Sequence, residues 1–132
     1  MVHTLLYVED NFADLKLVEH ITARYPNIRL LTAVTGHNGI EIARVSQPDV
    51  ILMDINLSDV SGFKALEILH SDSTTAHIPV IALSANTMPL NIESGLEAGF
   101  FRYLTKPIGI DELMDAVSAA FELAGRQSAK RK

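Results

Sequence analysis

The chain has 132 residues, 48% of them hydrophobic, which is the size of one ordinary domain with a substantial core and leaves no room for a second. It has no cysteine, which excludes disulfide bonds and thiolate metal sites and agrees with a reducing compartment. Residues 1–125 carry seven of the eleven bases and all sixteen acids, a charge of −9, and such an acidic body is not expected to bind nucleic acid directly.

The sequence gives no sign of a membrane-spanning segment or a signal peptide. No run of about 18 apolar residues is present, and the first residues lack the basic and small-residue flanks of a signal peptide. We therefore expect a soluble, cytoplasmic protein with no membrane partner. Residues 126–132 contain four bases and no acid, and we expect them to form a disordered tail after a single domain at residues 1–125.

Short apolar runs bounded by polar residues predict five strands, at 5–8, 28–34, 49–54, 78–83 and 101–104. The third run is the clearest, because four consecutive apolar residues lie between a Pro48-Asp49 turn and a polar loop. Such a run is typical of a strand buried on both faces of a parallel sheet. It ends in Asp54, at the edge where open α/β sheets bind their ligands.

The segments between these strands predict helices. The first carries an apolar stripe, is capped by Asn11 or Asp10, and ends before Pro26. Residues 35–39 are typical of a turn before a short helix at 40–45, and a third helix follows Gly62. A helix at 89–98 has few large apolar residues and should be the least firmly packed, with Gly99 as its C-cap. The last helix should end near Gly125.

Strands that alternate with helices through short connections predict an α/β fold with a doubly wound, five-stranded parallel sheet. The carboxyl ends of parallel strands meet at one edge of the sheet. Four strands of this chain are followed there by chemically useful side chains. These are Glu9, Asp10, Asp54, Ser84 and Lys106.

Three acids at one edge repel one another unless a cation neutralises them. Oxygen ligands without histidine or cysteine favour a hard ion such as Mg²⁺, which keeps open positions for phosphate oxygens. A carboxylate, a metal, a lysine and a hydroxyl suit phosphoryl transfer, with Asp54 as the nucleophile and with Lys106 and Ser84 each binding a phosphoryl oxygen. Taken singly, each has a plainer role, such as a helix cap for Asp10, a turn residue for Ser84 or a half-buried strand aromatic for Tyr103.

From about residue 4 to residue 121 the chain resembles the receiver domains of two-component response regulators. The motifs that carry the resemblance are Glu9-Asp10, Met53-Asp54, Ser84-Ala85 and the run 103–107, Tyr-Leu-Thr-Lys-Pro. The segment 95–103 is most similar to receivers fused to hybrid histidine kinases. The resemblance implies a flavodoxin-like fold with strand order 2-1-3-4-5.

The resemblance also implies a signalling switch rather than an enzyme that turns over a separate substrate. Asp54 would accept phosphate from a phosphohistidine on a histidine kinase or a histidine phosphotransfer protein. Glu9, Asp10, Asp54 and the backbone carbonyl of Asn56 would hold Mg²⁺, and no organic cofactor is expected. Ser84 and Tyr103 would pass the signal to the face formed by the fourth helix, fifth strand and fifth helix. We expect a monomer or weak dimer.

The chain departs from the usual receiver pattern in three places. Glu9 stands where aspartate is commoner, so it would reach a metal through water. Ser84 replaces the equally usual threonine, and the loop at 56–60 lacks the proline common after the phosphoacceptor.

Three other functions fit parts of the sequence less well. A haloacid-dehalogenase-like phosphatase would need a second acid two residues after the nucleophile, where this chain has Asn56. A flavin carrier would need glycines and hydroxyls after the first strand instead of an acid pair. A pseudo-receiver that only docks partners would not need the intact set of strand-end residues. Turnover of a phosphate monoester, flavin absorbance and phosphorylation of Asp54 distinguish these readings.

Overall fold

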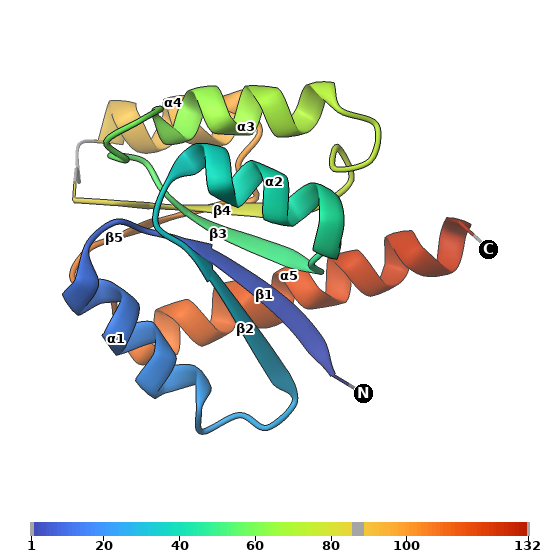
Figure 1. The fold of residues 1–132 in the computed structure, drawn as a ribbon, viewed down its shortest axis with the longest axis horizontal. Helices are drawn as coiled ribbons and strands as arrows, with labels where there is room; N and C mark the ends of the chain where they lie inside the picture. The colour runs from blue at the N-terminus through green and yellow to red at the C-terminus, as the bar shows by residue number, and fades with distance from the viewer. Residues whose placement is uncertain (1, 86–88, 132) are drawn as a thin grey trace.

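The computed structural model describes residues 2–85 and 89–131. Five parallel strands form one sheet in the order β2-β1-β3-β4-β5, which confirms the predicted topology. Helices cover both faces of this sheet (Figure 1). The elements alternate along the chain as β1 (His3–Val8), α1 (Phe12–Thr22), β2 (Ile28–Ala33), α2 (Gly36–Ser46), β3 (Val50–Asp54), α3 (Gly62–Ser71), β4 (Val80–Ser84), α4 (Pro89–Ala98), β5 (Arg102–Thr105) and α5 (Ile110–Arg131).

Two helices differ from their predicted bounds. α2 begins at Gly36 rather than near residue 40, because the Thr35 hydroxyl accepts a hydrogen bond from the Asn38 N–H at 3.1 Å and caps the helix. The segment predicted to be a turn is therefore the first turn of α2. α5 continues past Gly125 to Arg131, so most of the basic segment has helical backbone where a disordered tail was expected. Lys132 lies outside the described residues.

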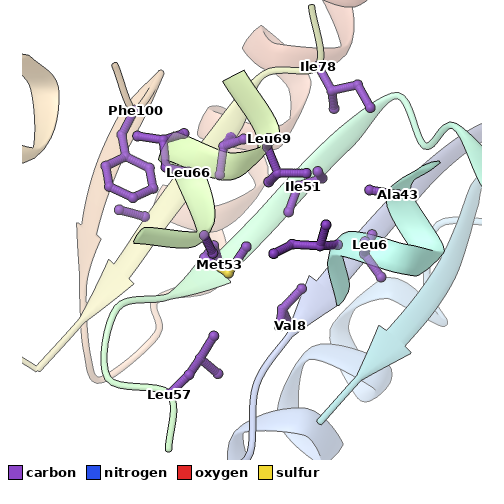
Figure 2. Packing of buried hydrophobic residues seen from close by; sticks show 14 of the residues in the cluster. Leu6, Val8, Ala43, Ile51, Met53, Leu57, Leu66, Leu69, Ile78 and Phe100 are labelled. Atoms are coloured by element: carbon purple, nitrogen blue, oxygen red, sulfur yellow. The ribbon is translucent and has the colours of Figure 1, made fainter. Parts of the chain in front are cut away.

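The sheet separates two apolar layers. Successive residues of β1 point to opposite faces, so Leu5 and Tyr7 pack with α1 and α5, whereas Leu6 and Val8 pack with α2 and α3. Figure 2 shows this second cluster, which surrounds Met53 of β3. All five residues of β3 are buried, as the continuous apolar run predicts for a central parallel strand.

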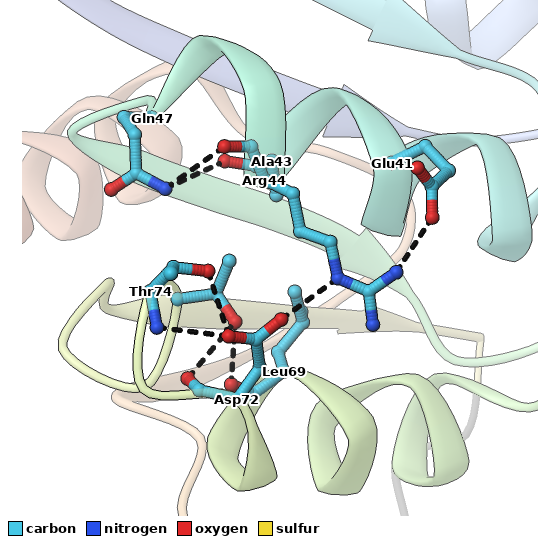
Figure 3. A network of polar contacts seen from close by, with 8 residues as sticks. Glu41, Ala43, Arg44, Gln47, Leu69, Asp72 and Thr74 are labelled. Carbon is cyan, nitrogen blue, oxygen red and sulfur yellow. Dashed lines mark hydrogen bonds and ion pairs between the residues drawn. The ribbon is translucent and has the colours of Figure 1, made fainter.

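Polar contacts join α2 to the end of α3, away from the carboxyl edge of the sheet (Figure 3). Arg44 of α2 donates from Nε to Asp72 at 2.8 Å and pairs with Glu41 at 2.6 Å. The N–H and hydroxyl of Thr74, with Arg44, lower the pKa of Asp72 to about 2. This network closes the end of α3 against α2.

α4 ends as predicted, at a glycine. Gly99 has a backbone φ of +116°, which residues other than glycine rarely adopt. Its N–H donates to the Leu96 carbonyl at 3.1 Å. Leu96 itself is 46% exposed, which agrees with the weak apolar stripe read from the sequence. In the described part of the chain, no helix has both the length and the apolar character needed to cross a membrane.

Candidate functional site

Three carboxylates meet at the carboxyl edge of the sheet. Glu9 and Asp10 follow β1, and Asp54 is the last residue of β3. The two strand ends lie side by side, because Val8 of β1 is paired with Met53 of β3. Each acid offers an oxygen within 4.8 Å of the others, so the three can share one cation. Glu9 and Asp54 are buried, whereas Asp10 is exposed. The structure thus brings together the three acids that the sequence placed at this edge.

Asp10 does not cap α1, because its neighbour Asn11 does, so the Asp10 carboxylate can belong to the site. The Asn11 side chain accepts a hydrogen bond from the Asp14 N–H at 3.0 Å, which settles the choice that the sequence left open. The Asp10 Oδ2 atom accepts instead from the Ser58 hydroxyl at 2.6 Å and from the Ser58 N–H at 3.2 Å. Ser58 was not predicted to belong to the site.

Glu9 is held inside the protein by three donors. Its Oε1 atom accepts from the Tyr7 hydroxyl at 2.7 Å and lies 3.0 Å from Lys106 Nζ, while Oε2 accepts from the Asn11 N–H at 3.3 Å. Burial raises the pKa of Glu9, and the nearby Asp54 carboxylate raises it further, although the Tyr7 and Lys106 donors oppose this. Burial, followed by the hydrogen bond to Glu9, raises the pKa of Tyr7.

Lys106, which follows β5, is closer to two other acids than to Asp54. Its Nζ atom lies 2.8 Å from Asp14 Oδ2, 3.0 Å from Glu9 Oε1 and 3.7 Å from Asp54 Oδ2. Burial by itself lowers the pKa of Lys106, but the hydrogen bonds to Asp14 and Glu9 outweigh it and raise that pKa. Asp14 was not predicted to belong to the site, although an acid in the first turn of the helix after Glu9-Asp10 is a signal that could have found it.

The loop between β3 and α3 has a defined path despite the missing proline. The Asn56 N–H donates to Asp54 Oδ1 at 3.0 Å, and the Gly62 N–H donates to the Ile55 carbonyl at 2.9 Å. Leu57 is buried in the core cluster. At the far side, Asp59 accepts from the Gly36 and His37 N–H groups at 2.9 and 3.0 Å. These backbone donors, with that of His37 first, lower the pKa of Asp59.

The two predicted switch residues lie on neighbouring strands. Ser84 ends β4 and is buried, one residue beyond Leu83, which is paired with Asp54. Tyr103 on β5 is half-buried and packs against the cluster beneath α2 to α4. A Cβ added at Gly95 of α4 would overlap the Tyr103 ring, so glycine allows this close approach. The ring is therefore packed against α4 in this structure.

The donor set defines the chemistry available at this edge. The acids supply only oxygen ligands, which suit a hard divalent ion better than zinc or copper, and the lysine supplies a cation for an incoming phosphate. The residues after β1 are Glu9, Asp10, Asn11 and Phe12, where a flavin phosphate would need glycines and hydroxyls. The geometry favours phosphoryl transfer to a carboxylate.

Comparison with known proteins agrees with this geometry. Residues 5–118 match the family model described as the response regulator receiver domain. The polar-differentiation response regulator DivK of Brucella ovis is 33% identical over 121 residues, which cover 90% of this chain and 96% of DivK.

Two solved structures are also similar. The receiver domain of the sensor histidine kinase PA1611 from Pseudomonas aeruginosa, with magnesium in its active site cleft, has a TM-score of 0.82 and 28% identity, covering 92% of this chain and 99% of its own. The signal receiver domain of a LuxO repressor protein from Vibrio parahaemolyticus has a TM-score of 0.91 and covers 100% of this chain and 99% of its own. At 23% identity, this second likeness supports the fold alone.

Proposed function

The chain belongs to the response regulator receiver domain family, and from that membership and the geometry of the acid cluster we propose that Asp54 is its phosphoacceptor. A receiver domain is a phosphorylatable signalling switch that works with a cognate histidine kinase or phosphotransfer protein. The observation that carries the assignment is that Asp54, buried at the end of β3, has Glu9, Asp10 and Lys106 around it.

The proposed reaction moves one phosphoryl group. A carboxylate oxygen of Asp54 attacks the phosphorus of a phosphohistidine, the P–N bond breaks with its electrons staying on the imidazole, and an acyl phosphate forms. Asp54 is 3% exposed, so little of its carboxylate faces bulk solvent. Lys106, 3.7 Å from Asp54, can turn to bind a phosphoryl oxygen, and the hydroxyl of Ser84 is proposed to donate to another.

Glu9, Asp10, Asp54 and the carbonyl of Asn56 are the proposed ligands of Mg²⁺. Receiver domains bind this ion, which neutralises the acids and the phosphoryl oxygens during transfer. The magnesium reported in the PA1611 receiver and the all-oxygen cluster here support the proposal. Glu9 is fully buried and already bonded to Tyr7 and Lys106, which supports an indirect contact through water rather than a direct bond.

The readout is proposed to involve α4, β5 and α5. Ser84 lies beside the phosphoacceptor, and movement of its hydroxyl toward a phosphoryl oxygen would change the space next to Tyr103 and α4. The resemblance to receivers implies that the Tyr103 ring turns inward from solvent when Asp54 is phosphorylated. Here the ring is already packed against α4, so we propose that phosphorylation changes the fit between Tyr103 and Gly95.

Whether this receiver is joined to a histidine kinase or stands alone is proposed from its similarity to other receivers. The segment 95–103 and the 28% identity with a receiver of a sensor histidine kinase support a receiver that is joined to such a kinase. The likeness to DivK over 96% of that protein supports the alternative, a receiver that stands alone. The coding sequence on either side of this chain distinguishes the two. The domain limits at residues 1–125, a monomer or weak dimer, and a cytoplasmic location stay predictions.

Labelling with a small phosphodonor tests the proposed function. Acetyl phosphate with Mg²⁺ should add one phosphoryl group to the protein, measured as intact mass, and omission of Mg²⁺ should abolish the gain. Asp54→Asn should gain nothing under the same conditions, because an amide is not a nucleophile toward phosphorus. Labelling of Asp54→Asn at the level of the unmodified protein would move the phosphoacceptor to another residue.

A further inference from the structure

Asp10 is the one exposed member of the acid cluster, and an exposed carboxylate on a short side chain has several rotamers open to it. In this structure one rotamer is selected by two hydrogen bonds. Both come from Ser58, 48 residues further along the chain, and both reach the same oxygen, Oδ2. The other oxygen, Oδ1, takes no part in the two Ser58 bonds.

Ser58 can select this rotamer because its own position is fixed. Leu57, immediately before it, is buried in the core cluster beneath α2 to α4. Asp59, immediately after it, binds two backbone N–H groups at the start of α2, at 2.9 and 3.0 Å. The loop is thus anchored on both sides of Ser58. A serine on a freely moving loop would impose no geometry on Asp10.

From these contacts we infer that Ser58 is a positioning residue for the metal site, which holds Asp10 in the rotamer that presents Oδ1 to the cation. Hydrogen bonds to a metal-binding carboxylate fix its orientation before the metal arrives, and their loss typically weakens metal binding by about 10-fold to 100-fold. Ser58 is exposed, so its hydroxyl should contribute at the lower end of that range. The inference rests on the proposed role of Asp10 as a Mg²⁺ ligand.

Two donors from one residue allow a graded test. Ser58→Thr keeps the N–H and the hydroxyl, Ser58→Ala keeps only the N–H, and Ser58→Pro keeps neither. The apparent dissociation constant of Mg²⁺ is measured from the rise of the thermal midpoint with Mg²⁺ concentration. As a second measurement, water-proton relaxation gives the amount of bound Mn²⁺ in each variant, and it does not depend on phosphorylation. Ser73→Ala, an exposed serine after α3, is the control for loss of a surface hydroxyl.

We expect Ser58→Thr to bind Mg²⁺ like the unmodified protein, Ser58→Ala to bind about tenfold more weakly, and Ser58→Pro to bind more weakly still. In an Asp10→Ala background, Ser58→Ala should change nothing further, because the effect passes through that carboxylate. A lower midpoint without Mg²⁺, combined with an unchanged dissociation constant, would mean that Ser58 only stabilises the loop, and would overturn the inference.

Two further outcomes separate this inference from the proposed function. If Ser58→Ala binds Mg²⁺ more tightly, Asp10 must leave Ser58 in order to bind the ion, and the positioning role is wrong. If Asp10→Ala binds Mg²⁺ as the unmodified protein does, the proposed ligand set itself is wrong, and the inference falls with it. Loss of binding in Asp10→Ala together with normal binding in Ser58→Ala would overturn only the role of Ser58.

Discussion

The ammonium of Lys106 lies 2.8 Å from the Asp14 carboxylate, so the lysine is paired with the first turn of α1. The same atom is 3.7 Å from Asp54. Lys106 must therefore give up part of its contact with Asp14 in order to bind a phosphoryl group on Asp54. Asp14 also adds a fourth negative charge close to a site that receives an anion.

Removing the charge of Asp14 should accordingly speed phosphorylation. The side chains of Lys106 and Asp14 are 21% and 24% exposed. Taking about 1 kcal/mol for such a partly exposed ion pair, we expect Asp14→Asn to raise the rate of labelling by acetyl phosphate by up to about fivefold. Asparagine keeps the size of the side chain and an oxygen that can accept from Lys106. Asp111→Asn, in the first turn of α5, is the control for a general loss of negative charge. Slower labelling of Asp14→Asn would mean that Asp14 holds Lys106 ready for the phosphoryl group.

Tyr7 should stabilise the fold through its hydroxyl. The ring and the Glu9 carboxylate are both fully buried, and the hydrogen bond between them is 2.7 Å long. Tyr7→Phe leaves a buried carboxylate with one donor fewer, which should lower the free energy of unfolding by about 1–3 kcal/mol. Urea unfolding measures this.

Tyr25→Phe is the matched control for Tyr7→Phe. Tyr25 is 37% exposed, so its loss of a hydroxyl should change the free energy of unfolding by less than about 0.5 kcal/mol. Equal effects of the two substitutions would show that the contact with Glu9 contributes nothing of its own.

The repulsion between Glu9, Asp10 and Asp54 should make the protein more stable when Mg²⁺ is bound. At ten times its dissociation constant, Mg²⁺ should add about 1.4 kcal/mol, which raises the thermal midpoint of a domain of this size by roughly 4–7 °C. Asp10→Ala or Asp54→Ala should raise the midpoint without Mg²⁺, because either removes a like charge. A midpoint that does not move at millimolar Mg²⁺ and neutral pH would show that the acids do not form one site.

Amide hydrogen exchange tests the proposed readout through Tyr103. Beryllofluoride, a phosphate mimic, should change protection at Ser84 and Ala85, across α4 and at Tyr103, because the ring and Gly95 are in close contact. Ser84→Ala should weaken this response and still allow phosphorylation of Asp54. Residues 86–88, in the loop between β4 and α4, lie outside the described structure, so the exchange prediction is made for Ser84, Ala85, α4 and Tyr103. Changes confined to residues 56–62 would mean that the signal leaves by another face.

Sequence patterns could predict the fold and the three acids because both depend on features local to each strand. A buried apolar run followed by an acid places Asp54 at the sheet edge whatever the rest of the chain does. Tyr7 and Ser58 were not predicted because their roles depend on which atoms meet in space, whereas Asp14 had a local signal as the acid in the first turn of α1. The bond from Ser58 to Asp10 spans 48 residues, and the Tyr7 hydroxyl reaches Glu9 only because the strand directs both side chains inward.

Helix limits failed for a different reason. The start of α2 depends on whether Thr35 caps it, and the pattern Thr-Gly-His-Asn-Gly suits a cap as well as a turn. The end of α5 was placed at Gly125 because glycine often follows a helix, but a Cβ at this glycine would meet nothing within 4 Å and the helix continues. Both errors concern competition between two local structures with similar sequence signals.

The identity of the phosphorylated residue is the most direct test of Asp54 as the phosphoacceptor. After labelling with acetyl phosphate and Mg²⁺, reduction with borohydride converts an aspartyl phosphate to homoserine, and peptide mass spectrometry then locates that residue. We expect homoserine at position 54 and at no other aspartate, and none when Mg²⁺ is omitted. Homoserine at Asp10 or Asp14, with Asp54 recovered unchanged, would contradict the assignment of Asp54 as the phosphoacceptor.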